Sequence, residues 1–311
     1  MNIVEVNHLR KEYGTLVAVK DMNFAVAQGQ VLGLIGPNGA GKTTILRMLA
    51  TVLEPTDGEI RVLGCDALKE YLTVRQAIGY MPDFFNLYDD LTITECLTFF
   101  ARAYKVPAQT IPERVETVLQ YTDLQTKKHD FIQHLSRGMV QRLGLAVSLV
   151  HNPELFLLDE PASGLDPKAR IELRNVLKRL SNEGKTIIIS SHILTELSDF
   201  CSHVIIMDQG ALLMHEKITD ILSKMEGARR VKITVLEGLA RAEKLIAALP
   251  HSQIERIEEN TLTVHLPYTL AELADVNKTL VEHGVKVVAF HEEKTSLEDV
   301  FLKISAQPPG V

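Results

Sequence analysis

The chain has 311 residues, of which 46% are hydrophobic and 23% are charged. This composition is typical of a folded protein of about two domains and excludes an intrinsically disordered one, which would contain fewer apolar residues. The formal net charge of −7 argues against a duplex-binding surface, because such a surface needs clustered Lys and Arg side chains, so we expect no nucleic-acid partner.

No part of the chain is expected to cross a membrane by itself. The longest apolar stretch, at residues 143–150, is far shorter than the roughly 18 residues that a spanning helix requires. Residues 1–5 lack the basic and apolar regions of a secretory signal. The three cysteines, Cys65, Cys96 and Cys201, show no CxxC spacing, which favours reduced thiols in the cytoplasm. Any membrane role would therefore need a membrane-embedded partner.

The first predicted elements are a strand, a turn and a helix. Val31–Ile35 is a short apolar run that predicts a strand buried on both faces, and Lys42–Leu49 follows a glycine-rich turn as a helix. Residues 84–150 show mostly helical patterns, and Thr92 with Glu95 forms a capping box, which is a start signal for a helix. We interpret residues 84–150 as a helical insertion between two parts of a sheet.

The segment after this insertion again alternates between strand and helix. The apolar runs at Leu155–Leu158 and residues 186–190 predict two strands, and between them Asp166 and Pro167 mark the start of a helix. This alternation predicts an α/β fold with a parallel sheet. A hairpin is expected next, at residues 204–214.

A second, smaller domain is predicted at residues 228–305, after a first domain at residues 1–224. Its apolar patterns give the order strand, helix, strand, strand, helix, strand, which predicts an α+β domain of the ferredoxin-like type. A final helix is expected from about residue 296, and residues 306–311 are expected to form a disordered tail.

A phosphate-binding loop is predicted between the first strand and the first helix. Residues 36–43 match the pattern G-x-x-x-x-G-K-[ST], in which backbone N–H groups and the helix N-terminus surround phosphate oxygens. Lys42 is expected to reach the β- and γ-phosphates, and the Thr43 hydroxyl is expected to bind Mg²⁺. The alternative, a chance glycine-rich loop, fits the flanking strand and helix poorly. The predicted nucleotide-binding residues are Gly36, Asn38, Gly39, Ala40, Gly41, Lys42, Thr43 and Thr44.

Two carboxylates follow the strand at Leu155–Leu158. A parallel strand delivers such residues to the carboxyl edge of the sheet, where α/β proteins bind ligands. Asp159 is expected to hold Mg²⁺, and Glu160 is expected to polarise the water that attacks the γ-phosphate. The alternative is an acidic pair that caps the following turn, but the phosphate-binding loop favours a catalytic pair. Together the two motifs predict a protein that binds a nucleoside triphosphate with Mg²⁺, and they leave kinases, GTPases and ATPases open.

Further motifs resemble those of ATP-binding-cassette (ABC) proteins. Residues 135–142 read Leu-Ser-Arg-Gly-Met-Val-Gln-Arg and resemble the LSGGQ signature, so we call them the signature segment. Residues 159–161 (Asp-Glu-Pro) and 163–166 (Ser-Gly-Leu-Asp) resemble the Walker B motif and the D-loop of that family. His192, after two serines, resembles its switch histidine, and Tyr13 resembles its adenine-stacking aromatic. The motifs follow the family's order over roughly residues 1–222.

The resemblance implies a head-to-tail dimer of two cassettes, which we expect to be a homodimer. ATP would lie between the phosphate loop of one cassette and the signature of the other. Ser136 and the backbone of Gly138 would contact the γ-phosphate in trans, and His192 would help to position the attacking water. A separate integral membrane permease would be driven from the cytoplasmic face. Residues 296–301 resemble the appended domain of exporter-type (ABC-2) cassettes, which favours export.

The sequence departs from the family pattern at three positions. Arg137 stands where the signature has glycine, and Met139 stands where it has glutamine. Because the backbone donors remain, we expect a working site, with the Arg137 side chain in solvent. Asp83 replaces the usual glutamine after residues 78–82. Two roles are open for it: its carboxylate reaches Mg²⁺ through water, or it serves only the loop that couples the cassette to the membrane subunit.

Two other classes of protein compete with a transporter subunit. A cassette ATPase of DNA repair or of the ribosome usually has a long coiled-coil insertion or two cassettes in one chain, and neither is present here. A GTPase would need an N-K-x-D element, but Asn277 and Lys278 are followed by Thr279 and Leu280 and lie in the predicted second domain. The sequence therefore favours an ATP-hydrolysing transporter subunit.

Overall fold

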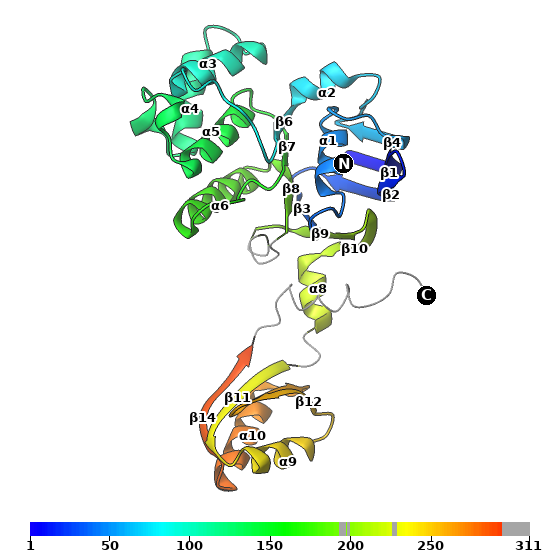
Figure 1. Cartoon of the computed structure of the whole chain (residues 1–311), viewed down its shortest axis with the longest axis vertical. Coiled ribbons are helices and arrows are strands. Elements are labelled where there is room, and N and C mark those ends of the chain that lie inside the picture. Colours follow the sequence, from blue (N-terminus) through cyan, green and yellow to red (C-terminus); the bar gives the residue numbers. More distant parts are fainter. Residues whose placement is uncertain (193–196, 198–199, 226–228, 294–311) are drawn as a thin grey trace. The chain divides into compact units, whose positions relative to one another are not determined.

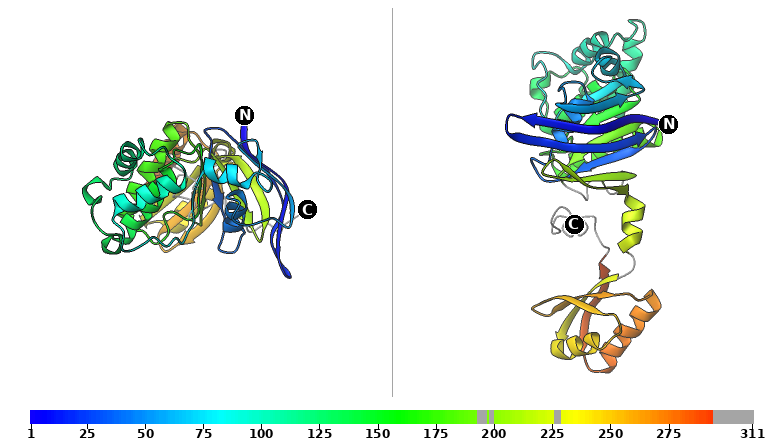
Figure 2. Two further views of the ribbon diagram at one scale, coloured as in Figure 1. Left: turned by 90° about the horizontal axis from the view of Figure 1, so that it is seen from above. Right: turned by 90° about the vertical axis from the view of Figure 1, so that its right-hand side faces the viewer.

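The computed structural model describes residues 1–192, 197, 200–225 and 229–293. These residues form two compact units, Met1–Lys217 and a smaller one that begins at Ile218 (Figures 1 and 2). Within the described ranges, every helix is too short or too polar to span a bilayer. The helix predicted from residue 296 and the tail predicted at residues 306–311 lie outside these ranges.

An antiparallel sheet opens the first unit. Its strands lie in the order β2-β1-β4-β5, and they are β1 (Asn2–Tyr13), β2 (Leu16–Ala27), β4 (Asp57–Val62) and β5 (Cys65–Asp66). These strands were not predicted from the sequence. The register between β1 and β2 shifts at several points, so the alternation of buried and exposed residues that marks a strand is interrupted.

A six-stranded sheet forms the centre of the first unit, in the order β10-β9-β3-β8-β7-β6. Its strands are β3 (Val31–Ile35), β6 (Ile78–Met81), β7 (Leu155–Leu158), β8 (Thr186–Ser191), β9 (His203–Asp208) and β10 (Ala211–Lys217). All neighbours pair in parallel except β9 and β10, which form the predicted hairpin. Every residue of β3, β7 and β8 is buried, which confirms the prediction of strands covered on both faces.

Helix α1 (Lys42–Leu49) lies between the two sheets (Figure 1). Its Ile45 and Leu49 belong to a core cluster that also contains Val4 of β1 and Leu157 of β7. Removing this apolar surface from water on both sides of the helix is strongly favourable. The packing therefore fixes the start of α1, and with it the glycine-rich loop that precedes the helix.

Helices fill the segment between β6 and β7, as predicted. They are α3 (Ile93–Ala103), α4 (Ile111–Tyr121) and α5 (Arg137–Leu149), with single 3-10 turns at Gln125–Lys127 and Ile132–His134. The predicted capping box is present, because the backbone N–H groups of Thr92 and Glu95 each donate to the other residue's side chain, at 2.8 and 3.3 Å.

Two more helices flank the parallel strands. Helix α2 (Tyr71–Ala77) precedes β6, and α6 (Pro167–Asn182) connects β7 to β8. At the start of α6, the Asp166 carboxylate accepts a hydrogen bond of 2.8 Å from the backbone N–H of Ala169, so Asp166 is the N-cap that the sequence predicts.

His151 is a partly buried histidine that connects the end of α5 to the sheet. Its ring stacks on Tyr104, with 3.8 Å between the ring centroids, and Nε2 donates to the carbonyl oxygen of Ile78 at 2.9 Å. Nδ1 is buried and has no hydrogen-bond partner among the described residues. Burial lowers the pKa of His151 to about 4. The imidazole is therefore neutral in the folded protein at ordinary pH.

We expect this histidine to make stability depend on pH. Because its pKa is lower in the folded protein than in the unfolded chain, its contribution is complete above about pH 6.5 and is lost as the pH falls towards about 4. The loss at pH 5 is roughly 2 kcal/mol of unfolding free energy. Urea unfolding at pH 7 and pH 5 measures it, and a His151→Phe variant should lose this part of the pH dependence. An unchanged dependence would contradict the assignment.

The second unit begins with α8 (Ile218–Met225) and continues with an antiparallel sheet in the order β12-β13-β11-β14. Its elements are β11 (Arg229–Glu237), α9 (Leu239–Ala247), β12 (Gln253–Glu258), β13 (Thr261–Leu266), α10 (Leu270–Glu282) and β14 (Lys286–Glu293). This is the predicted β-α-β-β-α-β order, with α9 and α10 packed on one face of the sheet through an apolar core.

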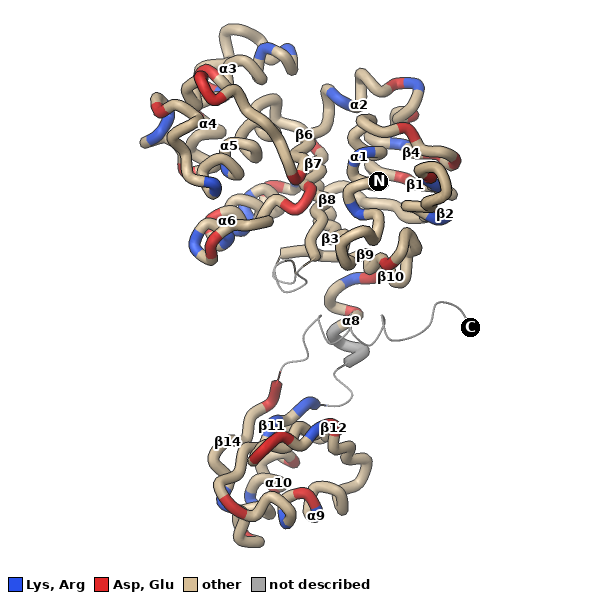
Figure 3. Tube along the Cα trace, viewed as in Figure 1, with Lys and Arg blue, Asp and Glu red and all other residues tan. Residues whose placement is uncertain are grey.

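Charged side chains of both signs lie on the strands of the second unit (Figure 3). Arg229 pairs with Glu292 of β14 at 2.7 Å, and Arg230 pairs with Glu255 of β12 at 2.9 Å. Such cross-strand pairs between opposite charges favour one register of the strands over its alternatives.

Candidate functional site

The glycine-rich loop between β3 and α1 adopts backbone conformations that favour glycine. Gly39 has a φ of +83° and Gly41 a φ of +103°, in the left-handed region. A Cβ on Gly41 would also lie 2.5 Å from the carbonyl oxygen of Ala18 in β2. The loop therefore packs closely on β2 and leaves its N–H groups and the first turn of α1 as a candidate anion site.

Lys42 is the first residue of α1, directly after this loop, and its side chain is only 5% exposed. Its ammonium donates to the carbonyl oxygens of Gly36 at 2.7 Å and Pro37 at 3.2 Å, and lies 3.4 Å from Oε1 of Glu160. A buried ammonium is stable only when it is paired and hydrogen-bonded. The loop and Glu160 thus hold the Lys42 ammonium in place. A phosphate bound in the loop could replace the Glu160 carboxylate as the partner of this ammonium.

Asp159 ends β7 beside the loop and has one oxygen without a partner. Its Oδ1 accepts from the hydroxyls of Thr43 at 3.1 Å and Ser190 at 2.7 Å. Its Oδ2 is buried and unpaired among the described residues. Burial raises the pKa of this carboxyl, although the two hydroxyl hydrogen bonds oppose the shift. A buried carboxylate oxygen without a hydrogen-bond partner is suited to bind a cation.

The donor set fits Mg²⁺ bound together with a nucleotide. Asp159 and Thr43 offer one carboxylate and one hydroxyl, and Mg²⁺ commonly binds through one or two carboxylates plus substrate phosphates. In the part of the chain that the structure describes, no group of three or more His, Cys, Asp or Glu side chains could hold a metal ion. The protein alone therefore offers an incomplete metal site that phosphate oxygens would complete.

Glu160 follows Asp159 and has both carboxylate oxygens paired. Lys42 approaches Oε1, and Nδ1 of His192 donates to Oε2 at 2.9 Å. The backbone of Glu160 is in the left-handed region, with a φ of +47°, and its N–H donates to the Ser190 hydroxyl at 2.8 Å. Strain of this kind persists only where neighbouring contacts fix it, and it is common at active sites.

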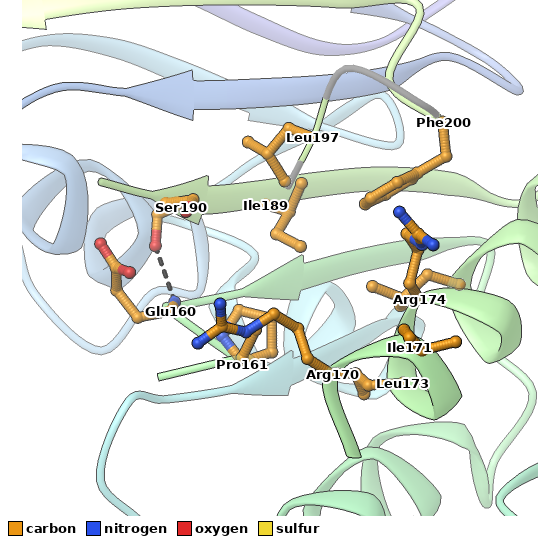
Figure 4. Close-up of a pocket in the computed structure, with 13 residues that line it drawn as sticks. Glu160, Pro161, Arg170, Ile171, Leu173, Arg174, Ile189, Ser190, Leu197 and Phe200 are labelled. Atoms are coloured by element: carbon orange, nitrogen blue, oxygen red, sulfur yellow. Dashed lines mark hydrogen bonds between the residues drawn. The ribbon is translucent and has the colours of Figure 1, made fainter. Parts of the chain in front are cut away.

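Ser190 at the end of β8 is a site residue that the sequence analysis did not single out. Its hydroxyl accepts from the backbone N–H of Glu160 (Figure 4) and donates to the Asp159 carboxylate, so one side chain contacts both acidic residues. Glu160 and Ser190 line one end of a cavity of about 150 Å³. The residue lies two positions before His192 in the Ser-Ser-His motif, which was the available signal.

Asp83 shares the electrostatic environment of these carboxylates. Burial raises the pKa of its side chain, and the negative charges of Asp159 and Glu160 raise it further. The positive charges of Arg137 and His192 oppose this shift. The residue that replaces the family glutamine therefore adds a third carboxylate to the same region.

Three predicted site residues lie apart from this group. Tyr13 ends β1 and is 46% exposed, with the ammonium of Lys11 lying 5.4 Å from its ring centroid. Ser136 is the N-cap of α5, and Gly138 lies in the first turn of that helix. Helices α5 and α1 lie on opposite sides of strands β6 and β7 (Figure 1). Within one chain, the signature segment and the phosphate loop are thus separate.

The Arg137 side chain makes a contact that the sequence did not predict. The residue is exposed, but its guanidinium also donates a hydrogen bond of 3.2 Å to the carbonyl oxygen of Ser163 in the D-loop. The side chain is therefore exposed to solvent, as expected, but it also contacts the loop that precedes α6.

Comparison with known proteins agrees with these motifs. Residues 19–163 match the family model described as ABC transporter. The chain is 33% identical to the Nod factor export ATP-binding protein I of Ralstonia nicotianae, over 98% of this chain and 94% of that protein. It is 30% identical to the linearmycin resistance ATP-binding protein of Bacillus subtilis, over 98% and 99%, and 31% identical to the bacitracin transport ATP-binding protein of Enterococcus faecalis, over 97% and 96%.

Solved structures of similar fold belong to the same group. An ATP-binding subunit of an ABC transporter matches with a TM-score of 0.65 and 29% identity, over 72% of this chain and 93% of that one. A dimeric ATP-binding cassette in a post-hydrolysis state with ADP and Pi matches with a TM-score of 0.63 and 26% identity, over 69% and 98%. The chain therefore belongs to the ABC transporter family and is an ATP-binding, ATP-hydrolysing subunit of that family.

Proposed function

We propose that two copies of this chain close on two ATP molecules, hydrolyse them and reopen, and thereby drive a separate membrane permease. The observation that carries this proposal is the arrangement of Lys42, Asp159, Glu160 and His192 at the carboxyl edge of the parallel strands. This edge is where open α/β sheets bind ligands. The solved dimeric cassette of similar fold supports a two-subunit arrangement.

Within one subunit, the phosphate loop would bind the ATP phosphates. Lys42 would exchange its contact with Glu160 for the β- and γ-phosphates, which releases Oε1 of Glu160. That oxygen would accept a proton from the attacking water, while His192 holds the carboxylate through Oε2. Mg²⁺, held by Thr43 and Asp159, would neutralise charge on the phosphates.

Across the dimer, the start of α5 would complete the site. Ser136 and the N–H of Gly138 lie at a helix N-terminus, which favours a bound anion, and would contact the γ-phosphate of the second subunit. Tyr13 would stack on the adenine, because its ring is partly exposed at the end of β1. Each ATP would then join two subunits.

The permease would bind near Asp83. Phe84 is 85% exposed and Tyr88 57% exposed, and Tyr88 contacts Phe99 with ring centroids 5.7 Å apart. Exposed aromatic side chains gathered in this way favour binding to a partner, here a cytoplasmic segment of the permease. The subunit would thus lie on the cytoplasmic face of the membrane. Similar proteins named for export and resistance support an exporter.

Asp83 is proposed to contact the metal through water. Replacing it by Asn should raise the Mg²⁺ concentration for half-maximal ATPase activity by about threefold to tenfold, because one negative charge near the cation is lost. Mg²⁺ titrations of the initial rate measure this change. The matched control is Asp90→Asn, an exposed aspartate further along the same segment. Identical Mg²⁺ titrations for both variants would remove Asp83 from the metal site.

Sedimentation of the Glu160→Gln variant tests the proposed dimer. With MgATP the variant should sediment as a dimer, because ATP is bound but not cleaved, and with MgADP it should sediment as a monomer. A species that has the same size with either nucleotide would contradict ATP-driven closure.

A further inference from the structure

Arg137 is the first residue of α5 and the main departure within the signature segment. A cation at a helix N-terminus is opposed by the helix dipole, so this position is intrinsically unfavourable for arginine. Contacts made by the Arg137 side chain must therefore offset this unfavourable interaction with the helix dipole. Those contacts lie in the D-loop of the same chain, at residues 163–166.

The guanidinium of Arg137 lies across the backbone of the D-loop. It donates to the carbonyl oxygen of Ser163 at 3.2 Å. It also occupies the space next to Gly164, because a Cβ on that glycine would collide with the guanidinium. Gly164 has a φ of +66°, so both its conformation and its lack of a side chain permit this contact.

The contact extends an existing interface between α5 and α6. A Cβ on Gly138 would lie 2.9 Å from the Cβ of Ala169, so the first turns of the two helices pack closely. Further along, Arg142 of α5 lies 3.6 Å from Glu172 of α6. Arg137 continues this contact onto the loop that precedes α6.

Backbone hydrogen bonds connect the D-loop to Glu160 through a turn. The N–H of Ser163 donates to the carbonyl oxygen of Glu160 at 2.9 Å, and the N–H of Leu165 donates to that of Ala162 at 3.3 Å. Arg137 contacts this turn through the carbonyl oxygen of Ser163. It therefore links the start of the signature helix to the turn that carries Glu160.

We propose that Arg137 is a positioning residue that holds the D-loop against the start of α5 within one subunit. This inference rests on the proposed ATP-bound dimer, in which the signature segment faces the second subunit. Ordering both segments before the subunits meet lowers the entropy lost on closure. A glycine at this position could not supply such a link.

Hydrogen exchange of the nucleotide-free protein tests the link directly. In Arg137→Ala, the amides of Ser163 and Leu165 should exchange about tenfold faster, because a charge-assisted hydrogen bond on the turn is lost. Arg137→Lys, which keeps one cationic donor, should restore part of the protection. The matched control is Lys168→Ala, which removes an 88% exposed cation from the first turn of α6. Unchanged exchange in Arg137→Ala would overturn the proposal.

Dimerisation in the Glu160→Gln background gives the functional readout. Adding Arg137→Ala should weaken the MgATP-dependent dimer by about tenfold and leave nucleotide binding by the monomer unchanged. Gly164→Ala should weaken the dimer less when Arg137 is already Ala, since the two residues act through one contact.

The outcomes separate this proposal from its alternatives. Weaker dimerisation with unchanged exchange, and additive effects of Arg137→Ala and Gly164→Ala, would mean that Arg137 contacts ATP on the second subunit, and would overturn the link. Failure of the Glu160→Gln protein to dimerise at all would contradict the proposed function. Hydrogen exchange in the monomer would then still decide whether Arg137 orders the D-loop.

Discussion

Replacing Glu160 by Gln should slow ATP hydrolysis by roughly 10²–10⁴-fold, the range that a positioned general base contributes. The amide cannot accept the proton of the attacking water. MgATP binding should remain at least as tight as in the unmodified protein, because Lys42 loses a competing negative charge 3.4 Å away. Steady-state phosphate release and titration with a fluorescent ATP analogue measure the two effects separately.

Glu154→Gln is the matched control, because Glu154 is exposed and immediately precedes β7, whereas Glu160 follows that strand. The control should hydrolyse ATP normally. Hydrolysis at the unmodified rate in Glu160→Gln would remove Glu160 from the catalytic role and assign the proton to another group.

Replacing Lys42 by Ala should weaken MgATP binding by about 100-fold, because a buried cation that would pair with two phosphates is removed. Little ATPase activity should then remain at millimolar ATP. Equilibrium nucleotide binding by calorimetry measures the change. Thermal unfolding without nucleotide shows whether the variant is folded, because Glu160 loses a partner in it.

Lys69→Ala is the control for charge alone, since Lys69 is 83% exposed and pairs with Asp66. It should bind MgATP normally. If Lys42→Ala also bound MgATP with unchanged affinity while folded, residues 36–43 would not be the phosphate loop.

The parallel sheet could be predicted because its strands are buried on both faces. Such strands appear in a sequence as short continuous apolar runs, as in Val31–Ile35 and Leu155–Leu158. The first two strands, Asn2–Tyr13 and Leu16–Ala27, could not be recognised, because register shifts interrupt their alternation. Helix caps such as Asp166 and Thr92 were found because their signal is local.

The site was predictable in its residue types but not in all of its contacts. The spacing from Gly36 to Thr43 and the strand before Asp159 imply one edge of a sheet, and the structure brings Thr43 and Asp159 within 3.1 Å. The link through Ser190 depends on the register of β7 and β8, which no local pattern encodes. The direction of the Arg137 side chain depends on the space beside Gly164, which only the folded chain reveals.

Affinity purification tests the central claim most directly. Tagged Glu160→Gln protein would be isolated with MgATP from the membranes of the cells that produce it, and the chains bound to it would be identified. A polytopic membrane protein in stoichiometric amount is the predicted result, because the closed dimer should remain bound to its permease. Ribosomes, nucleic acid or no membrane protein in the bound fraction would contradict a transporter motor.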